Sequence, residues 1–320
     1  MISIIIPAYN CAECVGRTIN SILTQTYTDY EIVVVDDGSA DATFDVLTDF
    51  AKKNPAVKVY SISNGGAYAA RLYGVGKAAG EWITFVDADD VLPANALELL
   101  ISEDDGMADI IAGTLSLNGK DFLPNKLSGL QSPENYMDAL LMHETSIGPY
   151  AKLYRRDLFG RTSLELECRI HQNEDLLMLM RLSAKVKAIK IAPDKVVYDY
   201  ILNPRGVSKQ KRPLTEWFAL FSLLAEVIKT LPYASVLQKP FTYYRITTLY
   251  EQGVLKMNDF NAVDPQLHEF YKSVKQMDLP ADYARKLAII KSPFRRFVWG
   301  CVTVAKNRIK DLIKGILNYG

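Results

Sequence analysis

Short apolar segments alternate with longer amphipathic segments through the first hundred residues, and this alternation restricts the fold more than any other feature of the chain. The segment EIVVV contains no polar alternation, which is typical of a strand covered on both faces. Strands and helices that alternate at this spacing predict a doubly wound, mostly parallel α/β sheet. The expected strands span residues 2–6, 31–35, 57–62 and 82–86, with helical patterns between them at 15–23, 41–54 and 67–78.

The pattern changes in the second hundred residues. An apolar stretch over 108–117 ends at Asn118-Gly119, which is a hairpin signal. Beyond Pro213 the chain has almost only helical patterns, so we expect a domain boundary near residue 210. Between these points we expect helices over 133–144 and 174–184 and a strand over 196–202.

Composition excludes several classes of protein. Formal charge is balanced, with 37 Lys+Arg against 37 Asp+Glu, so no nucleic acid partner is expected. The first residues, MISIIIPAYN, have the pattern of a buried strand and not of a secretory signal, and no apolar run approaches the ~18 residues of a membrane span. Four cysteines do not form a disulfide framework, so we expect a cytoplasmic protein. Because 49% of the residues are apolar, we also expect a packed core.

Polar motifs follow three of the four expected strands. They are Pro7-Ala8-Tyr9-Asn10, Asp36-Asp37-Gly38-Ser39 and Asp87-Ala88-Asp89-Asp90. The carboxyl ends of parallel strands face one crevice, where ligands bind in open α/β sheets. Like charges crowded at such a place cost stability unless a cation or hydrogen-bond donors accept them.

These motifs together predict a site for a nucleotide whose diphosphate arrives with a divalent cation. Asp36 or Asp37 can accept a hydrogen bond from a base, Tyr9 can pack on the base, and Asp87 and Asp89 can hold the metal. Each motif also has a structural alternative, because the Asp36 motif could be a turn and the Asp87 motif could cap a helix.

Four segments in combination resemble inverting family 2 glycosyltransferases with the GT-A fold: IIIPAYN, residues 20–43, residues 64–74 and FVDADD. The resemblance continues more loosely through 152–159 and 173–182 to Ser208. It implies a nucleotide-sugar donor, usually a UDP-sugar, with Mn²⁺ or Mg²⁺. It also implies a catalytic domain over 1–210, with a nucleotide-sugar-binding half at 1–105 and an acceptor half at 106–210, followed by a helical region at 211–320.

On the donor side, the resemblance assigns Pro7, Tyr9, Asp36 and Asp37 to the nucleoside pocket. Arg71 matches a donor-side arginine, although Leu72 stands where the family often has asparagine.

For the reaction itself, the resemblance assigns the D-x-D motif to Asp87-x-Asp89. Asp89 would be the direct metal ligand, and Asp87 would serve the ribose or a metal-bound water. Asp175 matches the catalytic base, and Glu174 would orient the site or the acceptor. The alternative is that these two acids only stabilise the N-terminus of a helix through its dipole.

The implied function is transfer of a single sugar to a hydroxyl of a glycan or lipid-linked acceptor in polysaccharide assembly, because the Q-x-x-R-W signature of processive synthases is absent. An alternative is a catalytically silent relative that binds nucleotide-sugar and docks a partner. A phospho-acceptor module would also gather acids at strand ends, but it needs only about 120 residues.

Three further residues and the chain's end carry weaker hypotheses. His171 could line the acceptor pocket or approach the metal, and Arg205 and Lys209 could contact the donor phosphates once their loop closes. Residues 292–320 combine an apolar stripe with many basic side chains. That pattern predicts either peripheral contact with the inner face of a membrane or an ordinary packed helix.

Overall fold

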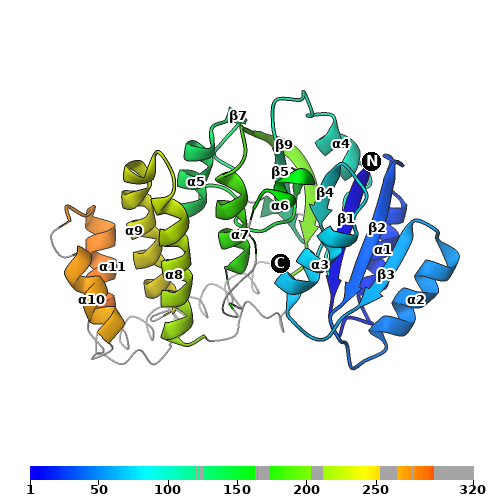
Figure 1. Ribbon diagram of the computed structural model, residues 1–320, viewed down its shortest axis with the longest axis horizontal. Helices are drawn as coiled ribbons and strands as arrows, with labels where there is room; N and C mark the ends of the chain where they lie inside the picture. The colour runs from blue at the N-terminus through cyan, green and yellow to red at the C-terminus, as the bar shows by residue number, and fades with distance from the viewer. Residues whose placement is uncertain are drawn as a thin grey trace, which may run out of the picture. The chain divides into compact units, whose positions relative to one another are not determined.

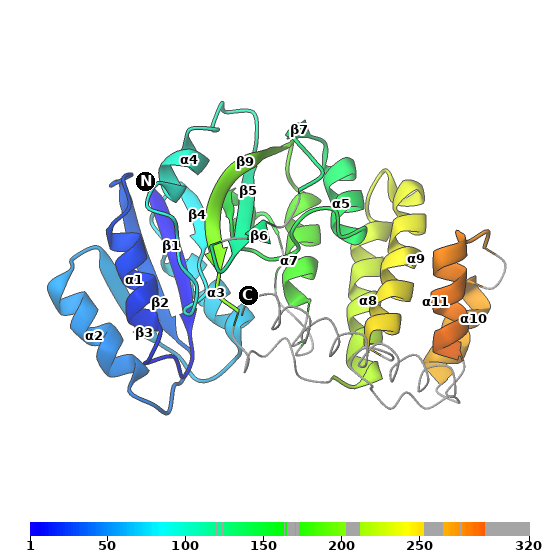
Figure 2. The ribbon, with the colours of Figure 1, turned by 180° about the vertical axis from the view of Figure 1, so that it is seen from behind.

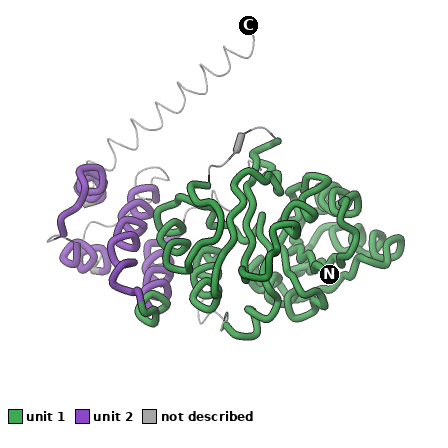
Figure 3. Tube along the Cα trace, turned by 90° about the horizontal axis from the view of Figure 1, so that it is seen from above, with its two compact units in different colours: residues 1–208, 227–232 green, residues 209–226, 233–320 purple. Residues whose placement is uncertain are grey.

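The computed structural model describes residues 1–119, 121–122, 125–162, 164, 170, 173–202, 212–252, 265–274 and 277–291. The chain forms two compact units (Figure 3). The first contains residues 1–208 and 227–232, and the second contains residues 209–226 and 233–320. The predicted catalytic role of residues 1–210, and the predicted boundary to a helical region at residue 210, remain predictions.

One sheet, with nine strands among the described residues, forms the centre of the first unit. Eight strands follow the order β3-β2-β1-β4-β8-β5-β9-β7, and β6 pairs with β5. Strands β1 to β4, β5 and β9 share one direction, whereas β6, β7 and β8 run against it. The expected doubly wound, mostly parallel sheet is therefore confirmed. The strands are β1 (Ile2–Ala8), β2 (Tyr30–Asp36), β3 (Val57–Ser61), β4 (Trp82–Phe85), β5 (Ile110–Leu117), β6 (Asp121–Phe122), β7 (Gly129–Gln131), β8 (Lys152–Arg155) and β9 (Ile189–Tyr200).

Helices cover both faces of the parallel half, as right-handed crossovers require. Helices α1 (Val15–Leu23) and α2 (Thr43–Lys53) lie on one face, and α3 (Ala67–Lys77) lies on the other (Figures 1 and 2). All seven residues of β1 are buried between these layers, which explains why its sequence shows no alternation.

Helix α3 packs unusually close to the sheet at Gly74. A Cβ atom at this position would lie 2.5 Å from Cγ2 of Ile5, which is closer than real contacts allow. The glycine therefore sets the distance between α3 and β1, and so the depth of the other α3 side chains that point toward the sheet.

The second half of the first unit contains α4 (Ala96–Ile101), α5 (Pro133–Leu141), α6 (Asp157–Gly160) and α7 (Glu174–Ser183). The hairpin expected at Asn118-Gly119 connects β5 to antiparallel β6. The strand expected over 196–202 instead begins at Ile189 and ends at Tyr200, so that prediction was wrong at both ends. The first part of β9 was not predicted because Pro193 is unusual in a strand. Here Pro193 lies in a bulge, where the register with β5 shifts.

The second unit is helical in its described residues, as expected from the sequence after Pro213. Its helices are α8 (Leu214–Lys229), whose last residues belong to the first unit, α9 (Ala234–Tyr250), α10 (Pro265–Val274) and α11 (Ala281–Lys291). Tyr243 and Tyr283 stack at 4.0 Å between ring centroids and join α9 to α11. Within the described ranges, every helix is too short or too polar to cross a bilayer. Residues 292–320, with the predicted membrane contact, lie outside these ranges.

Candidate functional site

The three acidic or aromatic motifs predicted from the sequence meet at one edge of the sheet. Strands β2, β1 and β4 are parallel neighbours, so the motifs that follow them lie side by side. Pro7 is buried within β1, and Tyr9 just beyond the strand is 53% exposed. Asn10 ties the first two motifs together, because its backbone N–H donates a hydrogen bond to the hydroxyl oxygen of Ser39 at 3.0 Å. An exposed aromatic ring thus stands at a fixed place beside the strand ends.

Asp36 and Asp37 are buried and bound by the protein itself. The two carboxylate oxygens of Asp37 accept from the backbone N–H groups of Gly65 and Gly66 at 2.7 and 2.8 Å. Asp36 accepts from the hydroxyl of Ser61 at 3.0 Å. In this arrangement Asp37 holds the turn that leads into α3 and Asp36 holds the end of β3. Their assignment to the nucleoside pocket remains a prediction.

Arg71 joins two carboxylates that the sequence separates widely. Its guanidinium is only 4% exposed and lies on α3. One terminal nitrogen lies 2.7 Å from Oδ1 of Asp87, at the end of β4, and the other lies 2.8 Å from Oδ1 of Asp175, in the first turn of α7. The residue expected at the metal and the residue expected to act as base are therefore held by one side chain.

The electrostatic environment of Asp175 favours a strong base. Burial raises the pKa of the Asp175 carboxyl above its ordinary value, while the Arg71 guanidinium opposes that rise. Burial, with a smaller contribution from the Asp175 charge, raises the pKa of Glu174 to about 8. A carboxylate with a raised pKa takes up a proton more readily at neutral pH than an ordinary one.

We expect the transfer rate to rise with pH through the raised pKa of this acid pair, because only the ionised base can accept a proton. The measurement is kcat/KM against pH, from about pH 5 to about pH 9. Glu174→Gln removes the carboxyl whose pKa is raised to about 8, so an acidic limb that remains in this variant belongs to Asp175. A flat profile in the unmodified protein would place the base elsewhere.

The acids after β4 have different surroundings. Asp90 is 1% exposed and faces the interior, where it accepts from the Tyr198 hydroxyl at 2.6 Å and from the backbone N–H of Ile201 at 2.8 Å. Asp89 is half-buried, and its backbone oxygen accepts from Arg17 at 2.7 Å. The charge crowding seen in the sequence is thus relieved partly by protein donors, among which neither Tyr198 nor Arg17 was predicted.

A second buried cation lies at the same edge of the sheet. Lys152, at the start of β8, is 1% exposed, and its ammonium donates to the backbone oxygens of Ser146, Gly148 and Tyr150 at 3.1, 2.7 and 3.4 Å. Burial lowers its pKa to about 7, while the charge of Asp175 acts in the opposite direction. The three acceptors match the three protons of an ammonium, so we interpret Lys152 as charged. In the sequence, the only feature that could have indicated this buried cation is that a lysine begins a short apolar strand.

The residues at this edge fit a divalent cation only with help from a ligand. Among the described residues, no group of three or more His, Cys, Asp or Glu side chains is arranged to hold a metal ion. Mg²⁺ in phosphate-transferring and related sites is commonly bound by one or two carboxylates together with substrate phosphates. Asp89 and Asp87 meet that requirement in residue type and place. His171, Arg205 and Lys209 lie outside the described residues.

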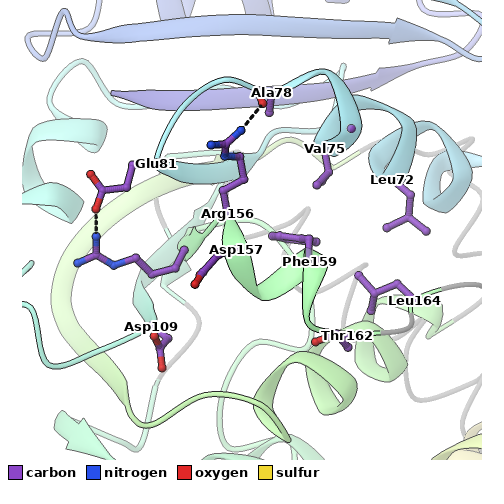
Figure 4. Close-up of a pocket in the computed structure, with 13 residues that line it drawn as sticks. Leu72, Val75, Ala78, Glu81, Asp109, Arg156, Asp157, Phe159, Thr162 and Leu164 are labelled. Carbon is purple, nitrogen blue, oxygen red and sulfur yellow. Dashed lines mark hydrogen bonds and ion pairs between the residues drawn. The ribbon is translucent and has the colours of Figure 1, made fainter.

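A cavity of about 1080 Å³ lies at the opposite edge of the sheet, where β4 begins and β8 ends (Figure 4). Figure 4 shows Arg156 directed toward the backbone oxygen of Ala78. Arg155, which also lines the cavity, forms an ion pair with Glu81. None of the carboxylates held by Arg71 lines this cavity, so it is separate from the candidate site.

Comparison with known proteins agrees with the geometry. The model of the family described as Glycosyl transferase family 2 matches residues 3–162. The chain is 31% identical over 218 residues to the uncharacterized glycosyltransferase EpsJ of Bacillus subtilis, covering 65% of this chain and 63% of that protein. It is 32% identical over 206 residues to a poly(ribitol-phosphate) beta-glucosyltransferase of Bacillus spizizenii, covering 62% of this chain and 31% of that protein. The match thus spans less than two thirds of either relative.

Solved structures share the fold. The structure of S. aureus TarS residues 1–349 in complex with UDP-GlcNAc superposes with a TM-score of 0.65 at 19% identity, over 89% of this chain and 78% of that one. The mannosyltransferase PcManGT from Pyrobaculum calidifontis, in complex with GDP-Man and Mn2+, superposes with a TM-score of 0.50 at 15% identity, over 94% of this chain and 86% of that one. At these identities the likeness establishes the fold alone.

Proposed function

The chain belongs to glycosyl transferase family 2 and is a glycosyltransferase, and we propose that it is a metal-dependent, inverting enzyme that adds a single sugar. The donor is a nucleoside diphosphate sugar, with UDP as the nucleotide. The acceptor is a hydroxyl of a glycan or of a lipid-linked glycan in polysaccharide assembly. UDP-GlcNAc bound to TarS and GDP-Man with Mn2+ bound to PcManGT support a donor of this class.

The observation that carries the proposal is the arginine shared by Asp87 and Asp175. A transferase needs its base within reach of the acceptor hydroxyl while that hydroxyl faces the reacting carbon of the donor. Arg71 brings the acid after β4 and the acid at the start of α7 to opposite ends of one guanidinium. Donor binding and proton removal can therefore take place at adjacent points of the sheet edge.

Asp175 takes the proton from the acceptor hydroxyl as that oxygen attacks the anomeric carbon. The bond between the anomeric carbon and the donor phosphate oxygen breaks in the same step, and the nucleoside diphosphate leaves with the electron pair. Attack from the face opposite the leaving group inverts the configuration, so no covalent intermediate forms. Glu174 orients the acceptor or the base.

Asp89 and Asp87 would hold the divalent cation, with Asp89 as the direct ligand. When bound, such an ion neutralises charge on a departing diphosphate. Asp89 suits this role by its place, because it is half-buried in the turn that follows β4. Asp90 is unsuited to it, since both of its oxygens accept hydrogen bonds inside the protein.

The proposed donor class is tested by thermal denaturation with UDP-, GDP- and dTDP-sugars, each with and without Mn²⁺. A ligand that binds only the native state raises Tm. At a ligand concentration of one hundred times Kd, it adds about 2.7 kcal/mol to the free energy of unfolding. We expect a rise with the UDP-sugars only when metal is present. The absence of a shift with every nucleotide would contradict the proposal.

Asp89→Ala should abolish the metal-dependent part of that shift, because the ion loses its direct ligand. Asp49→Ala serves as the matched control, since Asp49 is an exposed acid of α2 that pairs with Lys52 on the same helix. The Tm without ligand shows whether each variant is folded. Unchanged UDP affinity of Asp89→Ala in the presence of Mn²⁺ would remove Asp89 from the metal site.

Membrane contact through residues 292–320 remains a sequence-based prediction. If the basic, apolar pattern acts on an anionic surface, deleting these residues should lower co-sedimentation with vesicles that contain anionic lipid, and added salt should lower it in the full chain. Equal binding by both forms would leave the segment with a packing role only.

A further inference from the structure

We propose that Tyr198 is a positioning residue for the donor site, whose hydroxyl holds the turn from Asp87 to Asp90 in the form that receives the donor. The proposal rests on the proposed function and adds to it a residue from the other half of the sheet. Tyr198 lies on β9, three strands away from β4, and is fully buried.

The hydroxyl of Tyr198 is bound on both sides. It accepts a hydrogen bond from the backbone N–H of Asp87 at 3.0 Å and donates one to Oδ2 of Asp90 at 2.6 Å. A phenol has a single proton, and an N–H can only donate, so the direction of both bonds is fixed. One atom thus ties the first and last acids of the motif together.

The end of β9 holds this turn at two further points. The backbone N–H of Ile201 donates to Oδ1 of Asp90 at 2.8 Å, so each oxygen of that carboxylate is used. Val91 and Asp199 exchange backbone hydrogen bonds of 3.2 and 2.9 Å. The only side chain among these contacts from β9 is the Tyr198 hydroxyl, which is therefore the part that a substitution can remove cleanly.

The Tyr198 ring is itself held in place from the loop before β8. Tyr150 stacks on it with 4.7 Å between ring centroids and 19° between planes. The ammonium of Lys152 binds three backbone oxygens of that loop, including the oxygen of Tyr150. A continuous set of contacts therefore runs from the buried lysine to the acidic turn.

A packing role alone would not need the hydroxyl. Tyr136 illustrates the difference, because it is also fully buried but its hydroxyl has no hydrogen-bond partner among the residues that the structure describes. Removing the oxygen of Tyr198 leaves the N–H of Asp87 and one oxygen of Asp90 unpaired within the protein. The turn then has to move to satisfy them, and Asp89 moves with it.

The test compares Tyr198→Phe with Tyr136→Phe in the full chain. Amide hydrogen exchange of the peptide that covers residues 86–91 reports the turn without any ligand, and UDP titration with Mn²⁺ reports the donor site. We expect Tyr198→Phe to accelerate exchange in this peptide and to weaken metal-dependent UDP binding by about ten- to one-hundredfold. Tyr136→Phe should change neither quantity.

The outcomes separate this inference from the proposed function. If Tyr198→Phe lowers Tm but leaves metal-dependent UDP affinity within about twofold of the unmodified protein, the hydroxyl only stabilises the fold and the inference is overturned. Unchanged exchange at residues 86–91 would also overturn it. If the unmodified protein binds no nucleotide at all, the proposed function fails, while faster exchange in Tyr198→Phe still supports Tyr198 as the residue that holds the turn.

Discussion

Asp175→Asn is expected to lower the transfer rate by about 10²–10⁴-fold while donor affinity stays the same. The amide keeps the size and one acceptor oxygen of the carboxylate, so Arg71 retains a partner, but an amide cannot take the acceptor proton. The measurement is kcat for sugar transfer together with the Kd of the UDP-sugar in the presence of Mn²⁺.

Glu134→Gln is the matched control for that variant. Glu134 is an acid in the first turn of α5, as Asp175 is in α7, so it shares any interaction with a helix dipole. A loss of rate confined to Asp175→Asn identifies the proton acceptor. Activity within about threefold of the unmodified protein would show that the acid at the start of α7 serves the helix and not the reaction.

Arg71→Met is expected to destabilise the fold by about 3–5 kcal/mol, since breaking a buried ion pair leaves charges without a partner. Here two carboxylates, each about a quarter exposed, lose the same buried cation. Urea denaturation measures the loss of unfolding free energy.

Arg161→Met supplies the contrast, because Arg161 pairs with Asp157 on the surface of α6, where such pairs contribute about 0–1 kcal/mol. Arg71→Lys keeps the charge but cannot bind two carboxylates with one planar group. This variant should fold and should still lose activity. The acidic limb of its pH profile should move to higher pH, because the rise of the Asp175 pKa by burial is less strongly opposed. A cost below about 1 kcal/mol for Arg71→Met would mean that water or another cation replaces the guanidinium.

The sequence predicted the parts of the molecule that depend on local pattern. Apolar runs without alternation correspond to β1 and β2, which are buried on both faces. The alternation of strands and helices was enough to bring three acidic or aromatic motifs to one edge, because parallel neighbours present the same ends. The hairpin at Asn118-Gly119 followed from turn chemistry in the same way, as both residues have positive φ.

The contacts that organise the edge could not be predicted, because the residues that form them are distant from each other in the chain. Arg71 and Asp175 are 104 positions apart, and Tyr198 and Asp90 are 108 positions apart. No periodicity connects such pairs, and an arginine in a helix or a tyrosine in a strand is ordinary by itself. Lys152 was missed for a related reason, since its partners are backbone oxygens and any residue supplies those.

The close approach of α3 to β1 has a consequence for how substitutions in this chain should be interpreted. Gly74 lies three residues after Arg71 on the same helix, and Ile5 leaves no room there for even a methyl group. A larger residue would lift the helix and draw the guanidinium away from both carboxylates. In a screen of variants for catalytic output, this glycine would therefore behave like a reaction-centre residue, although it is neither ionisable nor able to touch a sugar.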